Sequence, residues 1–266
     1  MTGYRERVRD AIVARWRTAL ADEPRVRAIV EGGSAATGRL DQHSDIDFGV
    51  MIAPGATADD SALTERVFAE LEAALTGIDR IAQVCPVIES PWGATFVQRF
   101  YLLESAPPFF MLDVWVAPET VARPFLEVER HGTAVVYLER EGAAAAPAFD
   151  AGAHRARMVR RRAHIRAMWP VMRRTLDKDL ARGRWLDAFG FYTGGILRPL
   201  TELAGMRHRP ERFDFGWRYL HFDLPPDLVS EFLRLAYVAS PDALRALLPA
   251  TDKLSARLLD ETSDLV

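Results

Sequence analysis

Several features that would place the chain in a familiar class are missing from it, or nearly so. Cys85 is the one cysteine, so the chain cannot form an internal disulfide, and we expect a buried structural thiol there. No apolar run approaches the roughly 18 residues that a membrane-spanning helix needs, and the charged N-terminal stretch has no apolar core of a signal peptide. These absences predict a cytoplasmic protein.

An excess of charge of one sign is also missing. Lys and Arg number 34 against 37 Asp and Glu, which gives a formal net charge of -3 at pH 7. A protein that follows a nucleic-acid backbone usually has a basic excess, so the composition disfavours nucleic acid as a partner. Only Lys178 and Lys253 are lysines, which we interpret as a base-composition bias of the coding genome. With 266 residues, 49% of them hydrophobic, the chain suits one large or two modest globular domains.

What the sequence does contain is a glycine-rich segment followed by paired carboxylates. Gly32-Gly33-Ser34 is separated by ten residues from Asp45-Ile46-Asp47, and a run of strand-forming residues follows. Side chains two apart in a strand lie on the same face, so Asp45 and Asp47 would repel each other unless a cation lay between them. Oxygen ligands of this kind suit Mg²⁺. The glycines and the serine would let a phosphate group approach the backbone closely.

A third carboxylate lies in the apolar segment that runs from Phe109 to Val116. Asp113 is the one charged residue in this segment, which otherwise has the composition of a buried strand. An acid in such a place is costly to bury without a partner or a metal ion. We therefore expect Asp113 to face the same cation as the paired aspartates.

The segment from Gly32 to Asp47 resembles the signature of the nucleotidyltransferase superfamily that includes DNA polymerase beta. That signature is a hydrophobic-Gly-Ser segment, a spacer of roughly ten residues, and Asp-hydrophobic-Asp. The layout is similar to that of the small-molecule branch, which includes the aminoglycoside and lincosamide nucleotidyltransferases. Gly38 matches a glycine of that branch, whereas Thr37 stands where the branch often has arginine and Arg39 comes after it.

The resemblance implies an enzyme that moves a nucleoside monophosphate, most often AMP from ATP, onto a hydroxyl of a small molecule, with Mg²⁺ as cofactor. It implies that Asp45, Asp47 and Asp113 are the catalytic residues and the metal ligands, and that Gly33 and Ser34 bind the nucleotide. Asp113 would ligate the metal, act as general base toward the acceptor hydroxyl, or do both.

Three further residues are weaker candidates. Lys178 belongs to a basic segment, 177–185, that resembles a stretch in which related enzymes contact the triphosphate, so we expect it to bind the nucleotide. A solvated helix face is the alternative interpretation of that segment. Glu89 and Glu104 lie near the ends of expected strands and are reserve candidates for the base, although surface carboxylates are common at such places.

Periodicity along the chain predicts an α+β protein in two parts. An N-terminal nucleotidyltransferase domain, residues 1–142, would have a mixed β-sheet flanked by helices. A C-terminal all-helical domain, residues 143–266, would serve substrate binding or dimerisation. The expected strands are 26–31, 45–52, 81–88, 96–103, 109–116 and 134–138, and the expected helices are 4–20, 59–75, 153–177, 185–203, 227–238 and 241–259.

Two other functions stay open at this point. The acceptor could be a macromolecule, either a protein that receives AMP or an RNA that receives a nucleotide, although the near-neutral charge counts against RNA. The chain could also be an inactive relative that only binds nucleotide, and the presence of all three carboxylates speaks against this. The sequence leaves open the acceptor, the nucleotide base, and whether a homodimer completes the site.

Overall fold

The computed structural model describes residues 2–55 and 57–265. The chain divides into two compact units, Met1–Phe149 and Asp150–Val266. The sequence led us to place this division after residue 142, at the start of the alanine-rich segment, whereas the chain divides just before the long helix that opens the second unit. We describe each unit by itself.

Within the described part of the first unit, one mixed sheet of six strands has the order β3-β4-β5-β2-β1-β6. β2 and β5 pair in parallel, and every other neighbouring pair is antiparallel. The strands β1 and β2 that flank the glycine-rich segment lie beside each other at the centre. The bounds are β1 Val26–Glu31, β2 Ile46–Ile52, β3 Ile81–Pro86, β4 Val97–Leu103, β5 Leu112–Pro118 and β6 Val135–Glu139.

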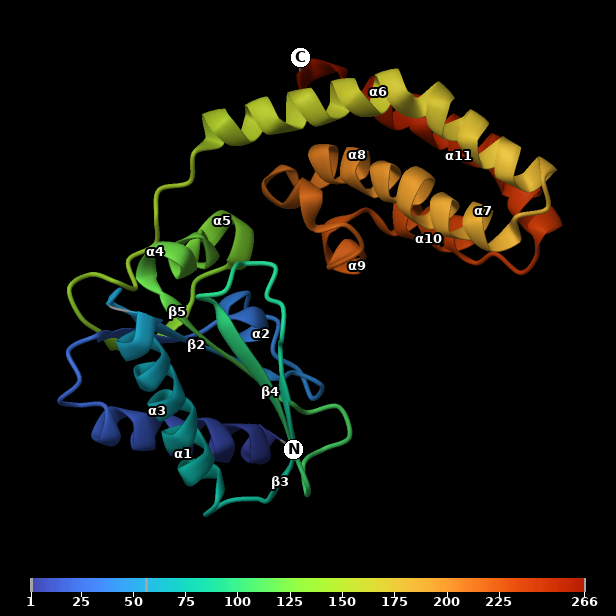
Figure 1. Cartoon of the computed structure of the whole chain (residues 1–266). Helices are drawn as coiled ribbons and strands as arrows, with labels where there is room; N and C mark the ends of the chain where they lie inside the picture. The colour runs from blue at the N-terminus through green and yellow to red at the C-terminus, as the bar shows by residue number, and fades with distance from the viewer. Residues whose placement is uncertain (1, 56, 266) are drawn as a thin grey trace. The chain divides into compact units, whose positions relative to one another are not determined.

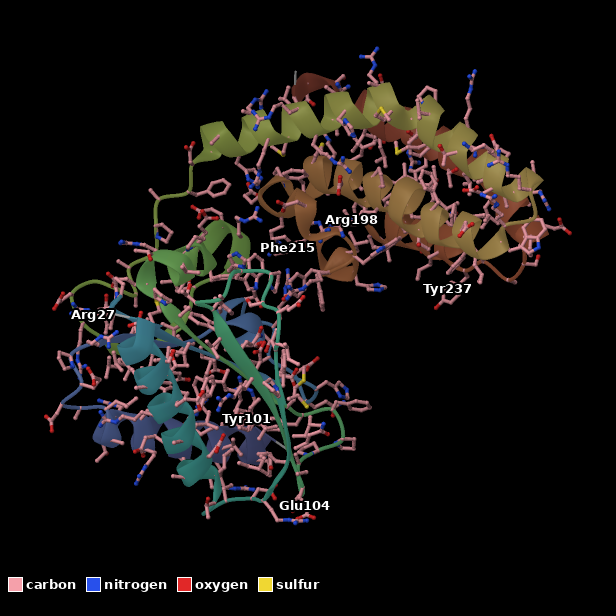
Figure 2. The ribbon with its side chains drawn as sticks, in the orientation of Figure 1. Arg27, Tyr101, Glu104, Arg198, Phe215 and Tyr237 are labelled. Carbon is pink, nitrogen blue, oxygen red and sulfur yellow. The ribbon has the colours of Figure 1, made fainter. Side chains whose placement is uncertain are left out.

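Two long helices, α1 (Thr2–Ala19) and α3 (Thr57–Leu75), pack together on one face of this sheet (Figure 1). The even-numbered residues of β2, such as Phe48, join their core, and the ring of Phe48 lies 5.2 Å from that of Trp16. Tyr101 of β4 lies on the same side, where its hydroxyl donates to Glu72 Oε1 at 3.0 Å (Figure 2). Because strand side chains alternate, the odd-numbered residues of β2 point to the opposite face.

Three short helical segments cover part of that opposite face, and the sequence did not predict them. They are α4 (Glu119–Ala122), η1 (Arg123–Leu126) and α5 (Val128–His131). Apolar residues of α4 and η1 pack on β1 and on the C-terminal ends of β2 and β5, in a second cluster that includes Met51 and Ala117. The ring of His131 in α5 lies 5.9 Å from that of Phe125 in η1. Each segment has four residues, which is too short for a helical hydrophobic period to be visible in the sequence.

The second unit is helical, as the sequence predicted. The expected helix 185–203 is instead three consecutive segments, in which π-helical turns separate α7 from α8. Pro199 has no N–H to donate and its ring would clash with the carbonyl group one turn earlier, so the backbone widens there. The segments are α6 Ala151–Ala181, α7 Trp185–Phe191, η2 Tyr192–Leu197, α8 Arg198–His208, η3 Pro210–Phe215, α9 Leu220–Asp223, α10 Pro226–Ala236, α11 Pro241–Glu261 and η4 Ser263–Leu265.

Together the two units confirm the α+β class expected from the sequence. Among the helices of residues 2–55 and 57–265, none is both long and apolar enough to cross a membrane.

Candidate functional site

The register of the sheet aligns four residues in one row across four strands. Asp47 of β2 is paired with Asp113 of β5, Asp113 with Phe100 of β4, and Phe100 with Cys85 of β3. Directly paired residues of neighbouring strands lie on the same face of a sheet. The two predicted carboxylates are therefore neighbours, about one strand spacing of 4.8 Å apart at their backbones. This is the face opposite α1 and α3.

Asp47 lies against the glycine-rich segment. A Cβ atom on Gly33 would lie 1.8 Å from Asp47 Oδ2, and the φ angle of Gly33 is +56°. No other residue fits here, because any side chain would displace the carboxylate and would also strain the backbone. The N–H of Gly32 donates to the carbonyl oxygen of Asp47 at 2.9 Å, which fastens the segment to β2. Ser34 follows in the turn α2 (Gly33–Ala36).

Asp45 lies one residue before β2 and is half-buried. Its Oδ1 accepts a hydrogen bond from the N–H of Met111 at 3.0 Å, and its carbonyl oxygen accepts one from Arg5 Nε at 3.1 Å. Burial raises the pKa of the Asp45 carboxyl, while the Met111 N–H and the Arg5 charge act in the opposite direction. Asp45 is thus held by the segment that leads into β5.

Asp113 is largely enclosed, and its charge is only partly compensated. Burial raises the pKa of the Asp113 carboxyl, the hydrogen bond from Gln98 lowers it, and the negative charge of Asp45 raises it again. Gln98 Nε2 donates to Asp113 Oδ1 at 2.6 Å. Gln98 was not among the residues predicted from the sequence. The sequence shows only an amide residue in the strand before Asp113. That this amide reaches Asp113 becomes clear only when the pairing of the two strands is known.

The donor chemistry of these residues fits a hard divalent cation such as Mg²⁺. Carboxylate oxygens are the ligands it prefers, and a bound cation would offset both the burial and the Asp45 charge that raise the pKa of Asp113. In the part of the chain that the structure describes, no three His, Cys, Asp or Glu side chains converge closely enough to form a ready-made metal site. Asp45 and Asp113 influence each other electrostatically, while Asp47 is turned toward Gly33.

The other predicted residues do not belong to this row of the sheet. Lys178 is exposed on α6 in the second unit. Glu104 forms an exposed ion pair with Arg80 at the end of β4, which lowers the pKa of the Glu104 carboxyl, and Glu89 is exposed in the loop after β3. The expectation of a buried thiol at Cys85 was wrong. Cys85 is half-buried, because β3 is an edge strand with residues exposed along most of its length.

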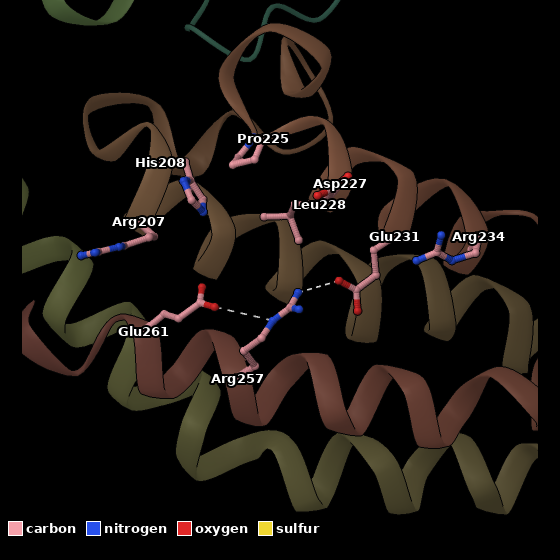
Figure 3. A pocket seen from close by; sticks show the side chains of 9 residues that line it. All are labelled: Arg207, His208, Pro225, Asp227, Leu228, Glu231, Arg234, Arg257 and Glu261. Atoms are coloured by element: carbon pink, nitrogen blue, oxygen red, sulfur yellow. Dashed lines mark hydrogen bonds and ion pairs between the residues drawn. The ribbon is translucent and has the colours of Figure 1, made fainter.

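The second unit has a cavity of about 450 Å³ that includes none of the predicted residues (Figure 3). Arg257 lies at its centre and forms ion pairs with Glu231 at 2.5 Å and Glu261 at 3.6 Å, so one positive charge partly compensates two negative ones. Burial lowers the pKa of His208 on the opposite wall. The site is therefore a mixed-charge pocket. Its lining residues are Arg207, His208, Pro225, Asp227, Leu228, Glu231, Arg234, Arg257 and Glu261.

Comparisons with known proteins add little to this geometry. No family model and no curated protein sequence matches the chain. Among solved structures, the chain is similar to an aminoglycoside 6-adenyltransferase from Bacillus subtilis, with 13% sequence identity over 96% of this chain and 89% of that one. The TM-score is 0.34, a likeness too slight to carry a functional argument.

Proposed function

We propose that this protein is a nucleotidyltransferase that moves a nucleoside monophosphate, AMP from ATP, onto a hydroxyl of a small molecule and releases pyrophosphate. The observation that supports it best is the pairing of Asp47 with Asp113 on one sheet face, with Asp47 packed against Gly33. Two neighbouring carboxylates beside a glycine segment combine the parts that phosphoryl transfer needs, a cation site and a close approach for phosphate.

In this proposal Asp45, Asp47 and Asp113 would hold Mg²⁺. When bound, the ion would neutralise negative charge on the triphosphate oxygens. Gly33 and Ser34 lie on the Asp47 side and would bind the phosphates through the backbone and the hydroxyl group. Lys178 of the second unit would contact the triphosphate as a point charge.

Asp113 is also our candidate for the general base. Its raised pKa favours proton uptake, and Gln98 occupies Oδ1, while no hydrogen bond to Oδ2 is found within residues 2–55 and 57–265. The acceptor oxygen would attack the α-phosphorus and give its proton to Asp113 Oδ2. The bond to the bridging oxygen of pyrophosphate would break in the same step. A base of this kind contributes about 10² to 10⁴ in rate.

The second unit would complete the substrate site or mediate dimerisation, the two roles that we expected for the helical domain. A macromolecular acceptor would use the same chemistry at the aspartates. A macromolecular acceptor therefore needs no separate mechanism.

The test is pyrophosphate release from each of the four nucleoside triphosphates with Mg²⁺, in the presence of aminoglycosides, lincosamides and other hydroxylated compounds. Asp45→Ala serves as the blank. Glu139→Gln, which changes an exposed acid on the edge strand β6, serves as the matched control. We expect acceptor-dependent release in the wild type and in the control, and none in the blank. Release that persists in Asp45→Ala would contradict the proposal, and nucleotide binding without release would indicate a macromolecular acceptor or an inactive protein.

A further inference from the structure

The sheet face that bears Asp47 and Asp113 continues onto β4 and β3, where it is open. Side chains of β4 alternate, so Gln98 and Leu102 share this face with Phe100, and Gln83 of β3 is paired with Leu102. Leu102 is 39% exposed, and Phe100 is half-buried. The short segments α4 and η1 pack instead on β1 and on the far ends of β2 and β5. We call the open part, formed by Gln83, Cys85, Gln98, Phe100 and Leu102, the β4 platform.

The row of paired residues gives the site two distinct sides. Starting from Gly33, it runs through Asp47 and Asp113 to Phe100, and ends at Cys85 on the edge strand. The glycine segment therefore lies on one side of the carboxylates and the β4 platform on the other. The strands are about 4.8 Å apart, so Phe100 and Cys85 lie about 5 and 10 Å beyond Asp113.

Phosphoryl transfer also requires its two substrate groups to lie on opposite sides of the reacting phosphorus. The attacking oxygen and the leaving oxygen lie roughly in line, on opposite sides of the phosphorus. If the leaving pyrophosphate lies at Gly33 and Ser34, the acceptor must approach from the side of β4. The position of Gln98 agrees with this approach. Its amide donates to one oxygen of Asp113 at the border of the platform.

The composition of the platform restricts the chemistry of what can lie on it. Neither β3 (Ile-Ala-Gln-Val-Cys-Pro) nor β4 (Val-Gln-Arg-Phe-Tyr-Leu-Leu) contains an acidic residue. The face offers an aromatic ring, a leucine side chain, a thiol and two amides. A polycationic acceptor would find no counter-charge there, whereas an apolar ring face would bury surface against Phe100 and Leu102.

We infer that the acceptor binds on the β4 platform, with its reacting hydroxyl at Asp113 Oδ2 and an apolar ring face over Phe100 and Leu102. The acceptor is thus a hydroxylated ring compound of low charge. The inference rests on the proposed function for its direction. It can be tested separately, because it predicts binding as well as turnover.

The sole cysteine of the chain serves as the reporter for binding. Cys85 is paired with Phe100 and half-buried, so a ring seated on Phe100 would shield its thiol. The experiment measures the rate of Cys85 alkylation by iodoacetamide in the full-length protein, by mass spectrometry, with and without each of two probes. The probes are phenyl β-D-glucoside, which is neutral and aromatic, and neomycin, which is a polycation.

We expect phenyl β-D-glucoside to slow alkylation at least threefold and neomycin to leave the rate unchanged. In Phe100→Ala the protection should disappear, and in Phe222→Ala, which removes an exposed ring of the second unit, it should persist. Leu102→Ala, with a smaller loss of protection, guards against misfolding of Phe100→Ala. Protection by neither probe, equal protection by both, or protection that survives Phe100→Ala would overturn the inference.

Turnover separates this inference from the proposed function. With any acceptor found in the pyrophosphate assay, Phe100→Ala should raise the acceptor KM about tenfold and leave the nucleotide KM unchanged. Turnover that depends on Asp45 but is insensitive to Phe100→Ala would refute the platform and retain the nucleotidyltransferase. Absence of any turnover would refute the enzyme proposal, and the alkylation result would still decide whether the platform binds a ring.

Discussion

The two units of the chain have opposite charge. Residues 1–149 contain 22 acidic and 14 basic residues, whereas residues 150–266 contain 15 acidic and 20 basic residues. The overall value of -3 conceals this separation. The acidic unit holds the three carboxylates that would need a cation, and the basic unit holds the one lysine that we expect to meet a triphosphate. A net charge taken over the whole chain is therefore a poor guide to what either unit binds.

The basic residues of the second unit themselves fall into two groups. The inward-facing ones are committed to the fold: Arg161 pairs with Glu202, Arg162 donates to the Leu259 carbonyl oxygen, and Arg173 pairs with Asp252. Arg174 and Lys178 are exposed on the same helix, and neither forms an ion pair with a described residue. Only charges of the second kind can bind a ligand without breaking a contact that stabilises the helices.

The largest effect that we expect falls on the acidic unit. Asp113→Asn removes both a cation ligand and the proposed base, so nucleotidyl transfer should fall by about 10² to 10⁴. The measurement is kcat for acceptor-dependent pyrophosphate release, with Glu139→Gln as the control on the same sheet. Loss of less than tenfold would show that another group takes the proton.

The next effect falls on the basic unit and concerns stability. Asp223 is paired with Arg209, and the side chains of the two are 4% and 1% exposed. Asp223→Ala would leave a buried guanidinium without its carboxylate, at a cost of about 3–5 kcal/mol. Urea unfolding followed by circular dichroism measures this, and Asp227→Ala, an exposed acid at the start of α10, should change stability by less than about 0.5 kcal/mol. Equal effects of the two substitutions would contradict the role of the buried pair.

A smaller effect distinguishes contact from backbone strain in the glycine segment. Gly33 and Gly38 both have positive φ, but a Cβ would clash with Asp47 at Gly33 and would meet nothing within 4 Å at Gly38. Gly33→Ala should therefore lower kcat about tenfold to a hundredfold by moving Asp47, and Gly38→Ala should destabilise the fold without this loss. Similar kcat values for the two variants would show that the position of Asp47 is unimportant.

The lysine prediction tests whether the basic unit contributes to the site. Lys178→Ala should raise the KM for the nucleoside triphosphate about tenfold, because a charge-assisted contact to phosphate is lost. Lys253→Ala is the matched control, since it removes the other lysine of the chain, which is also exposed. An unchanged KM in Lys178→Ala would assign that residue to the solvated surface.

The smallest effect is a pH dependence of stability. The folded protein raises the pKa of Asp113, so the folded state binds this proton more tightly than the unfolded state, and stability falls as pH rises from the ordinary carboxyl range through the raised pKa. Asp113→Asn should therefore raise the Tm at pH 7, measured with a chelator present, and not at pH 3. A lower Tm for the variant at pH 7 would mean that the ionised carboxylate stabilises the fold.

Much of the fold follows from local pattern. Strand β1 has the bounds that its composition predicted, and the long helices α1, α3, α6 and α11 lie where apolar residues recur with helical spacing. Local pattern predicted one continuous helix over 185–203 and missed the π-helical turns that precede Pro199. It also failed at Cys85, because a sequence does not state which strand lies at the edge of a sheet.

Some residues of the candidate site could likewise be found from the sequence, and others only from the structure. Gly33, Ser34, Asp45 and Asp47 were selected from spacing and from the residue types, and the structure places Gly33 directly against Asp47. Gln98 could not be selected from the sequence, because its contact with Asp113 depends on its lying diagonally across from that residue on the neighbouring strand. The sequence also could not show that the glycine segment, the carboxylates and the β4 platform follow one another along one row, because that order depends on strand pairing.

The sequence by itself selected Asp45 and Asp47 as candidates, because their spacing and the strand-forming run around them are properties of neighbouring residues. Only the tertiary structure decided that a Cβ atom at position 33 would clash with Asp47 and that Asp45 lies one residue before β2. Only the tertiary structure decided that Asp113 lies opposite Asp47, with Phe100 and Cys85 beyond it. That order depends on strand register, which is fixed by hydrogen bonds and core packing between segments far apart in the chain.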